Sequence, residues 1–302
     1  MAVCDYLGSN AKWHNLAKTE LDDVIHPDAL GAWLDRHIAT LDAIVHMGAI
    51  SATDATDADL VMRVNFGLSW HLWQWCARHH KRLLYASSAA TYGDGAQGYD
   101  DDASPEALSK LHPLNLYGWS KHAFDRRVAR AVDAAEGAPS QWAGLKFFNV
   151  YGPNEYHKGT MQSVVAQVYA AAASGDAVRL FKSHRTGIAD GGQQRDFVYV
   201  DDCVAVVLWL LDHPRVNGLF NVGTGRARTF AELIGAVFAA LDRPPHIRYV
   251  DMPEGLRGRY QYFTQARITR LREAGYAQPF QPVEAGVNTY VHAFLAQPDR
   301  YR

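Results

Sequence analysis

The sequence is poor in cysteine and contains no long apolar run. Three cysteines, Cys4, Cys76 and Cys203, are scattered along 302 residues and form no CxxC pair. This argues against a disulfide scaffold or a thiolate metal site and favours a reducing compartment, so we expect the cytoplasm. No stretch approaches the roughly 20 apolar residues that cross a bilayer, and the N-terminus lacks the features of a signal peptide.

An excess of charge of either sign is also missing. Thirty Lys and Arg stand against 32 Asp and Glu, giving a net charge of -2. No basic stripe with interleaved aromatic residues is present, which argues against a nucleic-acid partner. Of the fourteen histidines, His79 and His80 are adjacent and leave a helix in different directions, so we expect no metal site.

Apolar runs alternate with helical segments through the first two-thirds of the chain, which is typical of a parallel sheet covered by helices. Short strands are predicted at 2–4, 42–46, 83–87 and 145–150, and helices at 60–77 and 117–132. After Pro153, glycine and polar residues cluster before further helices and strands, including predicted segments at 230–241 and 264–274. We therefore expect an α/β fold, with a Rossmann-like doubly wound parallel sheet and a smaller α/β substrate-binding domain. The predicted cofactor-binding domain comprises 1–155 and about 195–225, and the substrate-binding domain comprises about 156–194 and 226–302.

The glycine-rich turn that should open such a sheet is not found at its start. That turn normally leads into a helix whose N-terminus holds the cofactor's pyrophosphate. The one literal GxGxxG, formed by Gly93, Gly95 and Gly98, is followed by Tyr99–Asp102, whose three carboxylates would repel a diphosphate. We expect the true fingerprint upstream of Met1, in a truncated chain or one with a mis-set start codon, and reading the upstream DNA tests this.

The missing first strand predicts a gap in the sheet. Asp5 follows the strand at 2–4 and stands where an acidic residue meets the adenosine ribose, so the chain begins at the sheet's second strand. Because the first strand is central in this order, its loss leaves the second and fourth strands without a common neighbour.

Tyr117 and Lys121 are four residues apart and share one face of a predicted helix. A nearby ammonium favours the phenolate and lowers the tyrosine pKa from about 10, giving a base that takes a proton from an alcohol as hydride leaves. Upstream, Ser88 is a candidate to hold the reacting oxygen, because strand alternation turns Ser87 to the other face. A turn-forming role for Ser88 is the alternative.

These motifs resemble the extended short-chain dehydrogenase/reductase family, which modifies nucleotide sugars. The resemblance rests on Ser87-Ser88 before Tyr92-Gly93, the YxxxK helix, Asn149 in FNVYGP, Arg195–Asp202 and Phe220–Gly225. A finer resemblance, to ADP-glyceromanno-heptose 6-epimerases, rests on Gly152–Met161 with its His-Lys-Gly, Gly258–Ala266, His46–Ser51 and Leu180–Ser183.

The resemblance implies epimerisation at C6 of ADP-D-glycero-D-manno-heptose, through a transient ketone reduced on its opposite face, for lipopolysaccharide core synthesis. It implies tightly bound NADP, with NAD possible, a nucleotide-sugar partner and a homo-oligomer, a homopentamer in that family. Tyr117, Lys121 and Ser88 would be catalytic on one face, and Lys158 would be the base on the other. Desolvation and neighbouring cations would lower the Lys158 pKa, although a solvated loop cation or a phosphate contact is the alternative.

The resemblance also assigns the binding residues. Those expected at the cofactor are Asp5, Tyr6, Lys12, Met47, Gly48, Ala49, Ile50, Ser51, Asn65, Tyr117, Lys121, Val150 and Lys158. Those expected at the substrate are Ser88, Asn149, Thr160, Gln167, Phe181, Lys182, Ser183, His184, Arg195 and Tyr260. Lys12 would offset a 2′-phosphate that Asp5 repels, which favours NADP. Asn65 is expected to tie neighbouring strand-end loops together, or else to be a polar helix residue. Gln167, Tyr6 and Lys182 depart from the subfamily's His, Asn and acidic residue.

Two other functions remain open. Another sugar-nucleotide epimerase, dehydratase or reductase would use the same fold, but a dehydratase usually carries Thr-Asp-Glu beside the serine, where this chain has Ala90-Thr91-Tyr92. The missing glycine-rich turn motivates the second alternative, a cofactor-less binding or scaffold remnant.

Overall fold

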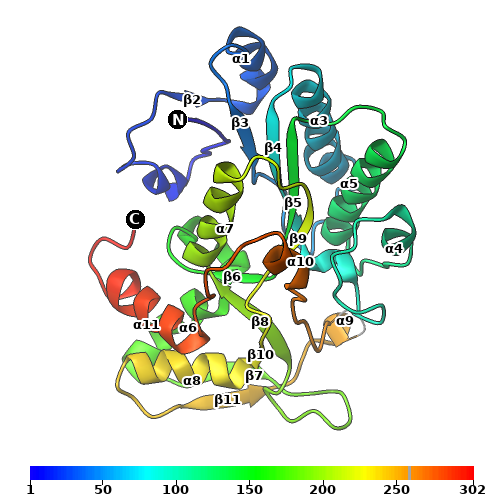
Figure 1. Cartoon of the computed structure of the whole chain (residues 1–302). Coiled ribbons are helices and arrows are strands. Elements are labelled where there is room, and N and C mark those ends of the chain that lie inside the picture. Colours follow the sequence, from blue (N-terminus) through cyan, green and yellow to red (C-terminus); the bar gives the residue numbers. More distant parts are fainter. Residues whose placement is uncertain (258–259) are drawn as a thin grey trace.

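The computed structural model describes residues 1–257 and 260–302, so Gly258 and Arg259 of the predicted substrate loop lie outside the described residues. A parallel four-stranded sheet in the order β3-β4-β5-β9 forms the upper half of the molecule (Figure 1). Its strands are β3 (Ala43–His46), β4 (Arg82–Ser88), β5 (Gln141–Phe147) and β9 (Gly218–Val222). The last three are almost wholly buried, as expected of parallel strands covered on both faces.

Helices cover both faces of this sheet, which confirms the doubly wound prediction. On one face pack α1 (Leu30–Arg36), α3 (Leu68–Arg78) and α5 (Leu116–Asp133), through a core that includes Trp73 and Phe124. On the other face pack α7 (Val200–Asp212) and α10 (Thr269–Glu273). Figure 1 shows α3 and α5 on the opposite side of the strands from α7.

Local sequence sets where the functional helices begin. The Asn115 side chain caps α5 by accepting a hydrogen bond from the Gly118 N–H at 2.8 Å, which places Tyr117 in the first turn. The helix predicted at 60–77 is found as α2 (Ala58–Val61), a π-helical turn η3 (Met62–Gly67) and α3. Such turns occur often at functional sites, and this one contains the buried Asn65.

The predicted gap in the sheet is present. β1 (Ala2–Cys4) pairs in parallel with β2 (Asp23–Ile25), and within the described residues this pair is not hydrogen-bonded to β3. Val45 on β3 is accordingly 41% exposed.

The remaining strands form two small sheets. One has the order β10-β8-β6, with β10 (Ala227–Thr229) antiparallel and β6 (Asn149–Tyr151) parallel to β8 (Gln194–Tyr199). The other pairs β7 (Val178–Phe181) with β11 (Ile247–Val250) in parallel. They pack with α6 (Val164–Ser174), α8 (Phe230–Ala240) and α11 (Val283–Tyr290) around a core of their own. The other short elements are η1 (Ala11–Asn15), η2 (Pro27–Ala29), η4 (Ala89–Tyr92), α4 (Pro105–Ser109), η5 (Tyr156–Met161), α9 (Glu254–Arg257) and η6 (Val291–Leu295).

One predicted element was wrong in extent. The single strand expected at 145–150 is divided at Phe148 between β5 and β6, which belong to different sheets. The segment predicted at 264–274 is helical only in α10, because its first part runs extended along β8, where Thr264 N–H donates to Gln194 O at 3.2 Å. No helix among residues 1–257 and 260–302 is long and apolar enough to cross a membrane.

Candidate active site

Ser88, Tyr117 and Lys121 meet at the carboxyl end of β4. Tyr117 hydrogen-bonds with Ser88, whose Oγ also accepts the Ala90 N–H at 3.1 Å. Gly118 makes this approach possible, since a Cβ there would lie 2.7 Å from the Ala90 carbonyl oxygen. The helix therefore lies directly against η4, and the phenol and the serine face the same space.

Burial is the largest cause of the pKa shifts of Tyr117 and Lys121. It raises the pKa of Tyr117, while the hydrogen bond with Ser88 acts in the opposite direction. The predicted lowering of the Tyr117 pKa was therefore wrong for the protein without bound ligands. The Lys121 ammonium instead donates to the Ala86 carbonyl at 2.8 Å, and burial lowers the Lys121 pKa to about 8.

Ser87 and Ser88 point in opposite directions, as the alternation along a strand predicts. Ser87 Oγ donates to Asp125 Oδ2 at 2.6 Å, inside the protein, whereas Ser88 serves Tyr117. The Ser88 hydroxyl also caps η4, so both roles considered for it are found in one side chain.

Residues Met47 to Ser51 follow β3 at the same edge of the sheet. Asn65 fixes this loop, because its Oδ1 accepts the Ile50 N–H at 2.8 Å and its Nδ2 donates to the Ile50 carbonyl and to Ser120 Oγ, each at 2.9 Å. Asn65 therefore connects this loop to α5. The sequence predicted a similar connection, between neighbouring strand-end loops. A Cβ at Gly48 would meet no atom within 4 Å, which leaves the backbone open to a ligand.

Asp5, Tyr6 and Lys12 lie together after β1. Lys12 Nζ lies 2.6 Å from Asp5 Oδ1 and donates to the Tyr6 carbonyl at 3.0 Å. The Tyr6 hydroxyl donates to Asp28 at 2.8 Å. An acid and a cation at the end of a parallel strand fit the ribose end of a dinucleotide cofactor. Among residues 1–257 and 260–302, however, no glycine-rich turn joins β1 to a helix, so the pyrophosphate cradle is not among the described elements.

Gly93, Gly95 and Gly98 form turns and not a phosphate loop, as predicted. Their φ angles are 63°, 80° and 78°. A Cβ at Gly93 would lie 1.9 Å from the His112 carbonyl oxygen, so glycine is required there for packing.

Lys158 lies on η5 (Tyr156–Met161), outside the hydrogen-bonded group around Tyr117. Lys158 is exposed on η5, which packs against η1, and the adjacent His157 Nδ1 lies 3.2 Å from Asn15 Nδ2. No hydrogen bond or ion pair of the described residues joins Lys158 to Tyr117 or Ser88. Gln167 donates to the Thr160 and Gln162 carbonyls at 3.1 and 2.7 Å, which braces the end of η5.

Arg195, Tyr260 and Phe181 come together as the substrate assignment predicts. The buried Arg195 guanidinium lies 5.1 Å from the centre of the Tyr260 ring, which meets Phe181 edge-on at 6.5 Å. Burial lowers the Arg195 pKa from its ordinary value. A guanidinium between aromatic rings suits a phosphate and a nucleotide base.

The adjoining residues Lys182, Ser183 and His184 have other partners. Lys182 lies 3.4 Å from Asp251, and the Ser183 N–H donates to Asp190 Oδ1 at 2.8 Å. His184 Nε2 accepts the Met252 N–H at 3.2 Å. These contacts shape the loop after β7. Asn149 is exposed and Val150 half-buried on β6.

The sequence did not predict two contacts of the Tyr260 segment. The Gln261 side chain donates to the Gly93 carbonyl, and the Tyr99 hydroxyl donates to the Phe263 carbonyl. The Tyr260 segment is thereby attached to the loop that follows Ser88. The motif around Tyr260 was visible in the sequence, but its attachment to Gly93 was not.

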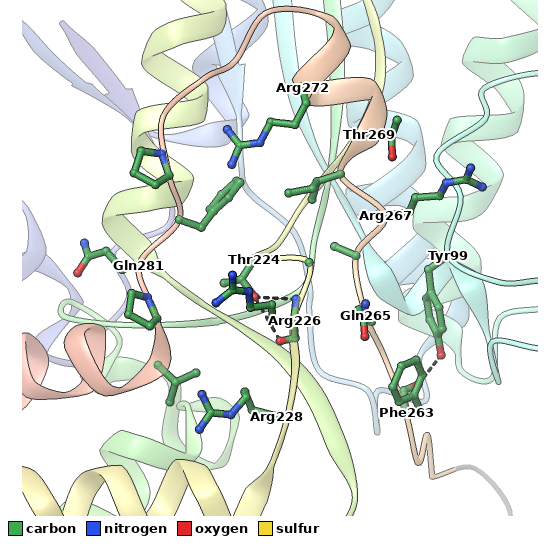
Figure 2. A pocket seen from close by; sticks show the side chains of 17 residues that line it. Tyr99, Thr224, Arg226, Arg228, Phe263, Gln265, Arg267, Thr269, Arg272 and Gln281 are labelled. Atoms are coloured by element: carbon green, nitrogen blue, oxygen red, sulfur yellow. Dashed lines mark hydrogen bonds between the residues drawn. The ribbon is translucent and has the colours of Figure 1, made fainter.

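A cavity of about 800 Å³ is lined by residues within 224–228, 263–269 and 279–283 (Figure 2). It contains neither Tyr117 nor Lys121. Arg228 and Arg267 on its wall are held by Glu284 and Asp100, at 2.5 and 2.6 Å. The catalytic side chains therefore lie outside this cavity.

The doubly wound sheet with a Tyr–Lys pair and a serine at its carboxyl edge defines a nicotinamide-dependent sugar-nucleotide enzyme. The family model of the NAD dependent epimerase/dehydratase family matches residues 4–223, and the chain belongs to this family. Its cofactor is accordingly a nicotinamide dinucleotide.

The relatives that match this chain over most of its length include heptose epimerases. The chain is 46% identical to ADP-L-glycero-D-manno-heptose-6-epimerase of Fusobacterium nucleatum subsp. nucleatum, over 99% of this chain and 91% of that one. It is 48% identical to the enzyme of that name from Nitratidesulfovibrio vulgaris strain DP4, over 100% and 92%. The crystal structure of the Helicobacter pylori enzyme superposes with a TM-score of 0.76 and 27% identity, over 96% of this chain and 86% of that one.

Proposed function

We propose that this chain converts ADP-D-glycero-D-manno-heptose to ADP-L-glycero-D-manno-heptose by inversion at C6, for the lipopolysaccharide core. The observation that carries the proposal is a Ser88–Tyr117–Lys121 group at the sheet edge of a chain 46% identical to an enzyme named for this reaction. Incubating the protein with ADP-D-glycero-D-manno-heptose and following C6 by NMR tests it.

The side chains around β4 provide one face of the reaction. The bound nicotinamide would supply the chemistry of accepting hydride from C6 and returning it. Tyr117 takes the proton of the C6 hydroxyl as the hydride leaves that carbon, and Ser88 holds the same oxygen by a hydrogen bond. Lys121, one turn further along α5, lies beneath them and fixes the end of β4 through the Ala86 carbonyl.

The nucleotide end of the substrate lies toward Arg195 and Tyr260. The guanidinium provides paired donors for the diphosphate, and the rings of Tyr260 and Phe181 provide faces for the adenine. Gln261 attaches this segment to Gly93, so nucleotide binding is coupled mechanically to the loop beside Ser88.

Reduction on the opposite face of the ketone requires a second acid, for which we propose Lys158. Lys158→Met is expected to lower the rate of C6 inversion by roughly 10²–10³-fold, because general acid–base groups typically contribute about this much. The KM for the nucleotide sugar is expected to stay within about threefold. NMR of C6 inversion measures both. Full activity in Lys158→Met together with an inactive Tyr117→Phe would make the two-base assignment wrong.

NADP is favoured over NAD by Lys12, which lies beside the ribose acid Asp5. Lys12→Ala is expected to weaken NADP binding by about tenfold and NAD binding by less than twofold, since a charge-assisted hydrogen bond is worth about 1.5–3 kcal/mol. Calorimetric titration with both dinucleotides measures the ratio. Lys18→Ala, in the same segment but paired with Asp299 at 2.7 Å, is the matched control. Equal losses for both dinucleotides would contradict the assignment.

We further infer a homo-oligomer that acts in the cytoplasm, with the two domains divided as the sequence predicts. The free thiols of Cys4, Cys76 and Cys203 agree with a reducing compartment. Light scattering coupled to size-exclusion chromatography measures the oligomeric state, and a monomeric mass would contradict it.

A further inference from the structure

A pair of opposite charges is buried beneath the active site. Asp125 is 1% exposed and Lys146 is 0% exposed, and Lys146 Nζ lies 2.9 Å from Asp125 Oδ2. Taking two charges out of water is costly, and apolar residues of similar size often stabilise a fold as well or better. Stability alone is therefore a weak reason for this pair.

Asp125 connects the catalytic helix to the residue before Ser88. It lies on α5, one turn beyond Lys121 and two turns beyond Tyr117. Its Oδ2 accepts the Ser87 hydroxyl at 2.6 Å, and its Oδ1 accepts the Tyr85 hydroxyl at 3.3 Å. The end of β4 is thus attached to the same helix that carries the base.

Lys146 holds the chain on the other side of Ser88. Its ammonium, on β5, donates to Thr91 Oγ1 at 2.7 Å, and Thr91 Oγ1 donates to the Ser88 carbonyl at 2.8 Å. It also lies 4.9 Å from the centre of the Tyr92 ring. Ser87, the Ser88 carbonyl and Thr91 are therefore all fixed by one charged pair, on both sides of the serine that contacts Tyr117.

We propose that Asp125 and Lys146 are positioning residues for the epimerisation proposed above, which hold Ser88 against Tyr117 through Ser87 and Thr91. Misplacement of a reacting group by about 1 Å can cost 10²-fold in rate. The pair is accordingly needed for turnover more than for folding or for binding the nucleotide.

Asp125 also shifts the pKa values of the catalytic side chains. It raises the pKa of Lys121, against the burial that lowers it. It raises the pKa of Tyr117 as well, against the Ser88 hydrogen bond. Burial and Lys121 lower the His46 pKa to about 3, and burial lowers the His122 pKa to about 4, so both rings are neutral near pH 7. Removing the carboxylate charge should thus move the titrations of Lys121 and Tyr117 to lower pH.

The test is the double variant Asp125→Asn/Lys146→Met, which removes both charges and leaves neither buried alone. We expect cooperative unfolding, a KM for ADP-D-glycero-D-manno-heptose within about threefold of the original, and a kcat lower by about 10–100-fold. We also expect faster exchange of the Ala90 amide, which donates to Ser88. The matched control is Arg127→Met/Glu136→Gln, a pair at 2.8 Å whose side chains are 26% and 47% exposed.

An unchanged kcat in the double variant would overturn the proposal while leaving the epimerase function intact. If that variant does not fold, Thr91→Val keeps the ion pair and removes only the relay hydroxyl. We then expect about tenfold lower kcat at constant KM, with rescue by Thr91→Ser, and equal kcat in Thr91→Val and Thr91→Ser would overturn it. A wild-type chain that inverts no C6 centre would instead contradict the proposed function, and this proposal with it.

Discussion

Tyr117→Phe is expected to lower the kcat for C6 epimerisation by about 10³-fold or more, the upper part of the range for loss of a general acid–base group. The phenyl ring retains the packing of α5 against η4 and removes only the hydroxyl that contacts Ser88. The KM for the nucleotide sugar should stay within about threefold, because Arg195 and Tyr260 lie elsewhere. NMR of the C6 proton measures the rate.

The control for this variant is Tyr249→Phe on β11, where the ring is 38% exposed and far from β4 in the fold (Figure 1). It should retain full activity. A Tyr117→Phe protein that epimerises at more than about a tenth of the normal rate would show that another group moves the proton.

Lys121→Met is expected to lower kcat by about 10²-fold and, near pH 7, to raise the free energy of unfolding. The folded-state pKa of Lys121 is about 8, below the ordinary value of 10.5, because burial disfavours the ammonium. Below pH 8 the folded protein therefore bears the cost of a buried charge. Between about pH 8 and pH 10.5 the unfolded chain binds the proton that the folded protein has released, so wild-type stability rises with pH.

The free energy of unfolding of Lys121→Met should therefore exceed that of the wild type most below pH 8. The difference should be on the order of 1–2 kcal/mol there, once the lost hydrogen bond to Ala86 is included, and should shrink toward pH 10.5. Urea unfolding at several pH values measures it. Lys110→Met, whose exposed ammonium pairs with Glu106 at 2.9 Å, is the control and should show no such pH dependence. A Lys121→Met protein that is less stable below pH 8 and gains relative stability above it would contradict this account.

The sheet was predictable because buried parallel strands appear in the sequence as short apolar runs. The gap beside β3 was also predicted, because no glycine-rich turn follows the strand at 2–4. The break at Phe148 was not predictable, because apolar residues continue across it and nothing local marks the change from one sheet to another.

The site was predictable where its residues are close in sequence. Tyr117 and Lys121 share a helix face, and Ser88 ends a recognisable strand. The predicted direction of the Tyr117 pKa shift was wrong, because the spacing to Lys121 does not reveal burial or where the ammonium points. Asp125 and Lys146 were missed because they lie on different elements, 21 residues apart. The available signal was Asp125 four residues after Lys121, on the same face of the helix.

The most direct measurement is NMR of the protein incubated with its nicotinamide cofactor and ADP-D-glycero-D-manno-heptose deuterated at C6. The account predicts ADP-L-glycero-D-manno-heptose that retains deuterium at C6, with no net reduction of the cofactor, because the hydride leaves and returns within one site. Unchanged substrate, or inversion with the deuterium lost to water, would contradict it.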